Sequence, residues 1–423
     1  MSTPRRVLMV AYHFPPLQGG SGVLRTLGFA RYLPEAGWEP LVLSASARAY
    51  AQTGEPGQGE QQLAELTVRR SAALDAARHL SLRGRYPGCL ALPDRWSSWW
   101  LSAVPAGLAM IRRYRPDAIW STYPIATAHL IGLTLHKLSG LPWIADQRDP
   151  MLDDSDPQAP YPPNPRVHRL HRWIEQRIAA KSAAIVCTTP GALAAHRRRL
   201  AQVDAGRFHL IENGYDEAGF EHANGAPAGH RGRFLLLHSG VIYPSERDPQ
   251  ALFEALGRLR RDGVLAAHNF QLLLRASGHD AWLTTLLVRY GITDLVTLAP
   301  LQPHREALRE MQSADGLLLL QAANCNGQIP AKLYEYLRCR RPVLALTDLA
   351  GDSAAKLRVC GIDTIGQLAS SSDCARALLR FLELARQGRA PLASPSSIAL
   401  HSRQARSHAL AGLLDQVTYR SQT

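Results

Sequence analysis

A lysine and a glutamate stand three residues apart, at Lys332 and Glu335, in the stretch QIPAKLYEYL that spans residues 328–337. This spacing places both side chains on one face of a helix. Pro330 suits the first turn of that helix, where its missing N–H costs no hydrogen bond. A cation at a helix N-terminus binds phosphate, and a nearby carboxylate accepts from ribose hydroxyls. The pair predicts a nucleotide-sugar site, and an ion pair on an ordinary helix surface is the alternative.

A glycine-rich turn follows the first apolar run of the chain and contains Gly19, Gly20 and Gly22. Such a turn lets backbone N–H groups approach an anion at the start of the following helix. The turn departs from the dinucleotide fingerprint, because the third glycine is missing and the second strand ends without an acidic residue. A nicotinamide or flavin enzyme is therefore disfavoured. A tight turn that binds no ligand is the alternative.

Three charged residues, Asp146, Arg148 and Asp149, stand at the end of a predicted strand. Open α/β sheets place ligand contacts at the carboxyl ends of their strands, so we expect these side chains to be exposed. Either acid could orient an acceptor hydroxyl, and Arg148 could bind phosphate or pair internally with Asp149. Further on, Asp154 and Asp156 match the D-x-D pattern of metal-dependent sugar transferases. We interpret them as part of a solvated acidic loop and predict no metal site.

Short apolar runs alternate along the chain with amphipathic helical stretches, and these elements position the residues above. This alternation is typical of parallel α/β architecture. The alternation occurs in two series. The first series of predicted strands covers residues 7–14, 39–46, 117–124, 143–149, 183–190 and 209–216, and the second covers 234–240, 270–278, 296–301, 316–323 and 341–347. The pattern predicts two doubly wound, Rossmann-like domains that face a cleft.

The predicted domain boundaries follow from these two series. Residues 1–220 form the first domain, and the Gly/Ala/His-rich stretch 221–232 forms a linker. The second domain covers residues 233–400. A final helix within residues 401–423 could return to the first domain.

Composition narrows the class of protein. A chain of 423 residues with 46% hydrophobic content is long enough for two domains with proper cores. Its six cysteines are scattered without zinc-ligand spacing, which favours reduced thiols in the cytoplasm. No apolar run approaches the length of a membrane span.

The net charge of +13 calls for an anionic partner or reflects a coding bias toward arginine. Zinc-finger, RRM and KH signatures are absent, so we predict no nucleic-acid binding. The stretch Arg166–Ile178 alternates basic and apolar residues at helical spacing and could lie on an anionic membrane. An ordinary helix that packs its apolar face on a sheet is the alternative. Trp96, Trp99 and Trp100 raise the same question, so we expect a cytoplasmic protein with at most peripheral contact at the inner face of the membrane.

Together these segments resemble the family-four retaining glycosyltransferases of GT-B fold, especially the branch found in bacterial surface-polysaccharide clusters. The resemblance covers nearly the whole chain. It rests on Tyr12-His13-Phe14-Pro15-Pro16 with the glycine turn, Ser121-Thr122-Tyr123-Pro124, Asp146-x-Arg148-Asp149-Pro150, Asn213-Gly214-Tyr215-Asp216, and Lys332-Leu333-Tyr334-Glu335-Tyr336-Leu337 followed by Arg341-Pro342.

The resemblance implies that the C-terminal half binds the nucleotide sugar and that the N-terminal half binds a glycan or lipid-linked acceptor. It implies that Glu335 contacts the donor ribose, that the glycine turn faces the transferring sugar and diphosphate, and that a hexosyl group is transferred with retention. Two departures stand out. The family often has an acid eight residues before this glutamate, where the chain has Gly327. The usual Arg and Lys after the glycine of the first C-domain strand are also not plainly present, which leaves Arg247 and Lys332 as cations for the diphosphate.

We therefore expect a metal-independent transferase that needs no cofactor beyond its nucleotide-sugar co-substrate. Arg and Lys would neutralise the departing diphosphate in place of a metal. Two other classes stay open. A nucleotide-sugar epimerase would have two such halves, and a non-catalytic nucleotide-sugar-binding scaffold would fit the missing acid at Gly327.

Overall fold

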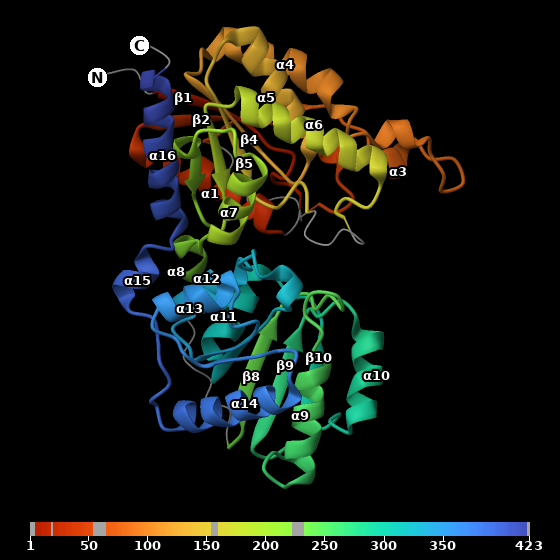
Figure 1. The fold of residues 1–423 in the computed structure, drawn as a ribbon, viewed down its shortest axis with the longest axis vertical. Helices are drawn as coiled ribbons and strands as arrows, with labels where there is room; N and C mark the ends of the chain where they lie inside the picture. Colours follow the sequence, from red (N-terminus) through yellow and green to blue (C-terminus); the bar gives the residue numbers. More distant parts are fainter. Residues whose placement is uncertain (1–4, 18–19, 54–64, 154–159, 222–231, 421–423) are drawn as a thin grey trace. The chain divides into compact units, whose positions relative to one another are not determined.

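Two parallel sheets organise the chain, and each is covered by helices on both faces (Figure 1). The structure is a computed structural model that describes residues 5–17, 20–53, 65–153, 160–221 and 232–420. The chain divides into two units. Unit 1 comprises Met1–Asn213 and Arg403–Thr423, and unit 2 comprises Gly214–Ser402.

The sheet of unit 1 has seven strands in the order β3-β2-β1-β4-β5-β6-β7, and all of its pairs are parallel. The residues of its central strands are all buried, as expected for strands covered on both faces. The strands are β1 Arg5–Val10, β2 Trp38–Ala45, β3 Thr67–Ser71, β4 Ala118–Thr122, β5 Trp143–Gln147, β6 Ala184–Cys187 and β7 Phe208–Leu210.

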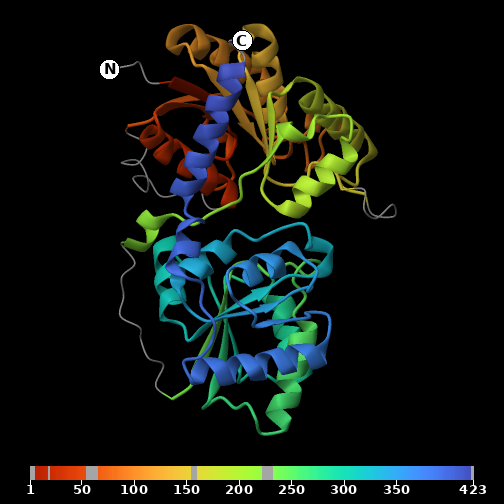
Figure 2. The same ribbon diagram turned by 60° about the vertical axis from the view of Figure 1, so that its left-hand side comes forward.

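The helices of unit 1 bury one core on each face of this sheet. One face carries α1 and α16, which lie side by side (Figure 2), and the other carries α4, α5 and α6. The longer helices are α1 Ser21–Tyr32, α4 Trp99–Tyr114, α5 Ala126–Ser139, α6 Pro165–Lys181, α7 Pro190–Arg199 and α16 Arg403–Arg420, and the short ones are η1 Leu33–Ala36, η2 Ala47–Ala49, α3 Ala76–His79, η3 Gly88–Ala91 and η4 Ala205–Arg207.

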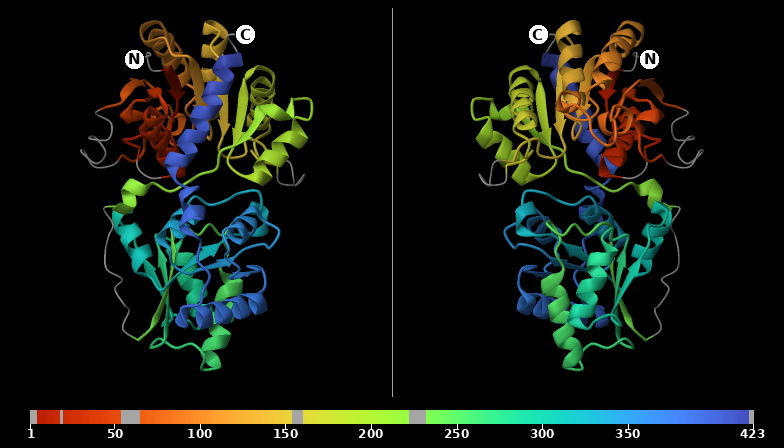
Figure 3. Two further views of the ribbon diagram at one scale, coloured as in Figure 1. Left: turned by 90° about the vertical axis from the view of Figure 1, so that its left-hand side faces the viewer. Right: turned by 90° about the vertical axis from the view of Figure 1, so that its right-hand side faces the viewer.

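The sheet of unit 2 lies between helices (Figure 3). It has six parallel strands in the order β10-β9-β8-β11-β12-β13. Its strands are β8 Phe234–Ser239, β9 Phe270–Arg275, β10 Val296–Ala299, β11 Gly316–Leu320, β12 Val343–Leu346 and β13 Ile365–Gly366. Its helices are α8 Glu217–Glu221, α9 Gln250–Arg261, α10 Asp280–Tyr290, α11 His304–Ser313, η5 Ala323–Cys325, α12 Lys332–Cys339, α13 Asp352–Val359, α14 Ser371–Arg386 and α15 Pro395–Ala399.

The predicted fold class is confirmed, since both units are doubly wound parallel α/β domains. Each predicted strand overlaps an observed one, although all of these observed strands end earlier and β1, β2 and β7 begin one or two residues earlier. Two strands were not predicted. β3 has the polar sequence TVRRS at a sheet edge, and β13 is only two residues long.

The unit boundaries fall between Asn213 and Gly214 and between Ser402 and Arg403. The first boundary therefore precedes the stretch 221–232 expected as a linker, of which residues 222–231 lie outside the described ranges. Residues 214–220, expected in the first domain, are in unit 2. The final helix packs on α1, where Ser407 Oγ donates to the Gly28 carbonyl at 3.4 Å.

None of the helices in the described ranges is long and apolar enough to cross a membrane. All six cysteines are free thiols, and five of them are buried.

Candidate functional site

The strand order of unit 2 reverses between β8 and β11, and ligands of doubly wound sheets bind at such a point, beyond the carboxyl ends of the strands. Gly240 follows β8 directly, and the segment after β11 leads into α12. Three of the donor residues proposed from the sequence, Arg247, Lys332 and Glu335, lie on the loops and helix that begin at these two strand ends.

Lys332 is the first residue of α12, and its ammonium group packs over the backbone of Gly240. A Cβ at position 240 would lie 2.9 Å from Lys332 Nζ, and the φ of Gly240 is +112°. Both the close approach and the backbone conformation therefore require glycine. The helix begins two residues after Pro330, so this proline precedes the first turn instead of forming it.

His238 contacts Lys332 and fixes the position of its ammonium group. This fully buried side chain lies on β8, with Nδ1 2.9 Å from the Leu318 carbonyl and Nε2 3.3 Å from Lys332 Nζ. A carbonyl only accepts, so Nδ1 carries the proton and Nε2 accepts from the lysine. Burial, and then the charge of Lys332, lower the pKa of His238 well below its usual value. The imidazole is therefore neutral and orients Lys332.

Arg247 supplies a second cation from the loop that joins β8 to α9. Its Nη1 donates to the Val241 carbonyl at 2.6 Å, and the guanidinium stacks over the Tyr243 ring at 5.3 Å. Burial first, and then the charge of Arg247, lower the pKa of Lys332 to about 7, although Glu335 opposes this shift. Lys332 and Arg247 therefore repel each other beside the N-terminus of α12. A bound diphosphate would be stabilised there, because its negative charge relieves this repulsion.

Glu335 lies on the first turn of α12 and is mostly buried. Its Oε1 is 3.1 Å from Nε2 of His304, which begins α11. The carboxylate is thus held by a neighbouring helix and lies close enough to Lys332 to raise its pKa. This arrangement agrees with the predicted common face of Lys332 and Glu335.

The segment between β11 and α12 is fixed by one buried amide. Gln321 Nε2 donates to the carbonyls of Cys325 and Gln328, at 2.8 and 2.9 Å. The Ala322 N–H donates to the Glu246 carbonyl at 2.7 Å, which ties this segment to the loop that carries Arg247. These bonds fix where α12 starts, and hence where Lys332 and Glu335 lie.

Unit 1 has its own cluster of predicted residues at the N-terminus of α1. Arg148 is buried, and its Nη1 donates to Ser21 Oγ at 2.9 Å, while Nη2 donates to Asp149 Oδ2 at 2.7 Å. A Cβ at Gly22 would lie 2.6 Å from Arg148 Nη1 and 2.8 Å from His13 Nδ1. Glycine at 22 is therefore needed for this guanidinium and imidazole to pack against the helix.

His13 is neutral in this cluster, because burial and the charge of Arg148 lower its pKa to about 4. Gly20 caps α1 with a φ of +82°. Gly19 lies outside the described residues. A buried guanidinium at the positive end of a helix is suited to hold an anion or an anionic acceptor group.

Asp146 differs from the prediction. Its side chain is 0% exposed and forms a two-bond ion pair with Arg25 of α1, at 3.0 and 2.8 Å. Thr122 Oγ1 donates to the same carboxylate at 3.0 Å. The expectation that Asp146 and Arg148 are exposed was wrong. Asp146 is paired with a buried cation from a helix that lies on the sheet, and Arg148 is buried against the start of α1. Asp149 is half-exposed and pairs with Arg148, as in the internal-pair alternative.

The structure thus groups Gly22, Arg148 and Asp149 in unit 1 and Arg247, Lys332 and Glu335 in unit 2. Sequence reasoning missed the residues that hold them, namely Ser21, Arg25, His238, His304 and Gln321. Among these, His238 had a visible signal as a lone histidine in the apolar run FLLLHS.

Within the described ranges, no group of three or more His, Cys, Asp or Glu side chains could hold a metal ion. Asp154 and Asp156 of the D-x-D pattern lie outside these ranges.

Residues 19–214 match the family described as the glycosyl transferase 4-like domain. This span lies in unit 1 apart from its last residue. It contains the Arg148 cluster apart from His13, and none of the candidate donor residues of unit 2. No curated protein matches the chain.

Solved structures of the same fold cover the chain almost end to end. Sucrose-phosphate synthase from Thermosynechococcus elongatus aligns with a TM-score of 0.66 at 16% identity, over 97% of this chain and 98% of the other. HepE from Anabaena, solved in complex with UDP, aligns with a TM-score of 0.60 at 13% identity, over 98% of both chains. A putative UDP-N-acetylglucosamine 2-epimerase from Listeria monocytogenes aligns with a TM-score of 0.57 at 11% identity, over 97% of this chain and 95% of the other.

At these identities the alignments establish the fold, which is that of GT-B glycosyltransferases.

Proposed function

We propose that this chain transfers a sugar, of hexosyl type and with retention, from a nucleotide donor bound by unit 2 to an acceptor bound by unit 1. The observation that carries the proposal is the convergence of Lys332, Arg247 and Glu335 at the switch point of the unit 2 sheet. The family match of unit 1 supports it, and HepE, which has the same fold, was solved with UDP and with UDP-glucose.

The proposed mechanism assigns charge neutralisation to the protein itself. As the glycosidic bond to the diphosphate breaks, negative charge grows on the leaving oxygen, and Lys332 and Arg247 would stabilise it with the N-terminus of α12. Glu335 would accept hydrogen bonds from the ribose hydroxyls. This charge balance needs no metal ion, so we propose metal-independent transfer.

In unit 1 we propose that Arg148 and Asp149 contact the acceptor. Asp149 is half-exposed and could orient a hydroxyl, whereas buried Asp146 would position Arg25 and the start of α1. The acceptor we propose is a glycan or a lipid-linked sugar of surface-polysaccharide synthesis. Such an acceptor would place the enzyme in the cytoplasm, with peripheral contact at the inner face of the membrane.

A panel of nucleotide sugars tested by thermal shift would identify the donor, because a ligand that binds only the folded state raises its stability with the logarithm of concentration over Kd. The epimerase alternative has the same fold, as the Listeria protein illustrates. Free nucleoside diphosphate released with sugar incorporated into a lipid or glycan supports transfer. A changed nucleotide sugar without such incorporation supports epimerisation, and binding without any turnover supports a scaffold.

A further inference from the structure

A short hairpin extends from unit 1 between α3 and η3 (Figure 1). Leu82 and Arg85 exchange backbone hydrogen bonds of 2.8 and 3.1 Å, and the two residues between them, Arg83 and Gly84, have positive φ angles of 52° and 77°. This is a two-residue turn with the primed geometry of tight hairpins. A Cβ at Gly84 would meet no atom within 4 Å, so the space around this position of the turn is open.

The tip combines an exposed leucine with basic charge. The Leu82 side chain is 81% exposed, and Leu80 and Leu90, on either side of the hairpin, are also exposed. Residues 76–93 contain Arg78, Arg83, Arg85 and no aspartate or glutamate. An exposed apolar residue among cations, with no acid to pair them, is complementary to an anionic bilayer.

The neighbouring helix α6 adds to this charge. His171 of α6 lies 3.1 Å from the Pro93 carbonyl, which joins α6 to the segment after the hairpin. The outer face of α6 exposes Arg166, Arg169 and Arg172, while its apolar residues Ile174 and Ile178 are buried against unit 1. The α6 helix therefore attracts lipid mainly through its cations, since Trp173 is only 38% exposed and its ring lies against the Arg177 guanidinium.

The tryptophans after the hairpin are poor candidates for insertion. Trp99 is fully buried, Trp96 packs on Tyr12 with ring centroids 5.0 Å apart, and the half-exposed Trp100 donates to Thr134 Oγ1. Leu82, at 81%, is the most exposed large apolar residue among those described in this region.

We propose that the hairpin at Leu82–Arg85 inserts Leu82 into the headgroup region of an anionic membrane, with Arg83, Arg85 and the outer face of α6 bound to lipid phosphates. This inference deepens the proposed function, on which it rests for the membrane-associated acceptor. The proposed partner of the hairpin is the lipid bilayer. If the hairpin instead binds another protein, the chain should not bind vesicles.

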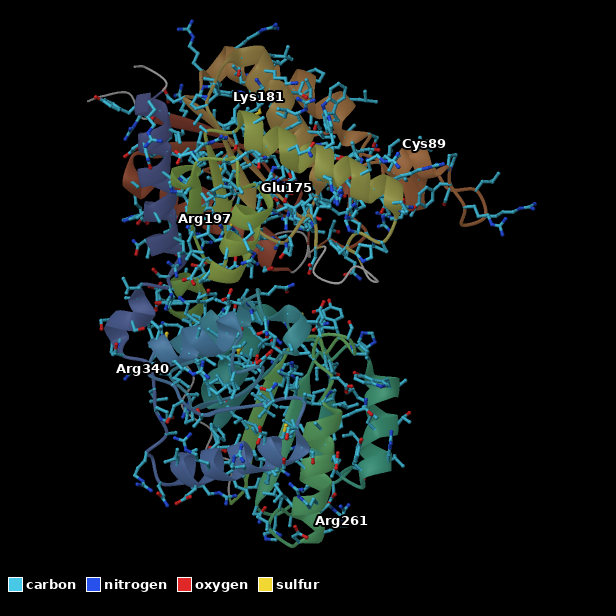
Figure 4. The ribbon with its side chains drawn as sticks, viewed as in Figure 1. Cys89, Glu175, Lys181, Arg197, Arg261 and Arg340 are labelled. Atoms are coloured by element: carbon cyan, nitrogen blue, oxygen red, sulfur yellow. The ribbon has the colours of Figure 1, made fainter. Side chains whose placement is uncertain are left out.

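Cys89 allows the native chain to report on this contact. Cys89 is exposed next to the hairpin (Figure 4). The other five cysteines are buried. An environment-sensitive fluorophore attached to Cys89 should shift to the blue with vesicles of equal parts phosphatidylcholine and phosphatidylglycerol. It should not shift with phosphatidylcholine alone. High salt should weaken the response, since the Debye length falls from about 10 Å at 0.1 M to about 3 Å at 1 M.

Two variants with matched controls separate insertion from simple adsorption. Leu82→Asp should weaken vesicle partitioning at least about tenfold, whereas Val359→Asp, at an 80% exposed apolar position of unit 2, should have no effect. The double variant Arg83→Glu/Arg85→Glu should weaken vesicle partitioning to a similar extent. The matched double variant Arg258→Glu/Arg261→Glu, on the exposed side of α9, should not weaken it. Unlabelled protein in vesicle co-sedimentation should give the same order.

Three results would overturn the inference: no binding to the anionic vesicles at low salt, equal binding to neutral vesicles, or full binding by Leu82→Asp. UDP binding without vesicles is measured on the same preparations. It should be unchanged in every hairpin variant, so that failure of the membrane inference is distinguishable from failure of the proposed function.

Discussion

Nucleotide binding by unit 2 should depend on pH through Lys332. Burial and Arg247 lower the pKa of this lysine to about 7, so about half of the unbound molecules carry it charged at pH 7. A bound diphosphate favours the charged form and raises the pKa. Binding near and above pH 7 should therefore take up a proton.

The size of this effect follows from the pKa. Below pH 7 the lysine is already charged, and its contribution to affinity is constant. Above pH 7 each binding event must also protonate it, so affinity falls toward tenfold per pH unit, or roughly fivefold between pH 7 and 8. The terminal phosphate of UDP titrates near pH 6, about a unit below this range.

Isothermal titration with UDP at several pH values, in buffers of different ionisation enthalpy, measures both affinity and proton uptake. Lys332→Gln should bind more weakly and lose the pH dependence between pH 7 and 9. Lys137→Gln, at an exposed lysine of α5, should behave as wild type. Wild-type affinity that stays constant from pH 7 to 9, with no proton taken up, would refute the assignment of Lys332 to the diphosphate.

Three further predictions follow. Glu335→Gln should weaken UDP binding by about 1.5 to 3 kcal/mol, the range for a charged hydrogen bond. The control Glu254→Gln, on the exposed side of α9, should bind as wild type. If calorimetry gives equal affinities for Glu335→Gln and wild type, Glu335 is not part of the site. Transfer activity should survive EDTA, and loss of activity that manganese restores would return the D-x-D acids to the active site. Arg25→Ala should lower the free energy of unfolding by about 3 to 5 kcal/mol in urea denaturation, because it leaves Asp146 buried without its cation, and a change below about 1 kcal/mol would contradict that role.

Much of the fold could be predicted from the sequence, because buried parallel strands are apolar runs with turn signals at their ends. β3 and β13 were not predicted, because β3 is an edge strand rich in arginine and β13 has only two residues, so neither is an apolar run. The common face of Lys332 and Glu335 was predictable, since it follows from helical spacing alone.

The side chains that tune these residues were less accessible to sequence reasoning. Lys332 and His238 are separated by 94 residues, and Arg25 and Asp146 by 121. Such pairs are set by strand order and helix packing, which no local pattern encodes. For the same reason the burial of Asp146 was missed, although its place at the end of β5 was foreseen.

Sugar transfer itself tests the account most directly. The chain is incubated with the nucleotide sugar selected by thermal shift, labelled in its sugar, and with extracted lipid-linked glycans as acceptors. We predict that free nucleoside diphosphate and labelled glycolipid form in equal amounts, and that Glu335→Gln and Lys332→Gln abolish or strongly reduce both. Tight donor binding without labelled product from any acceptor fraction, or product formation unchanged in both variants, would contradict the account.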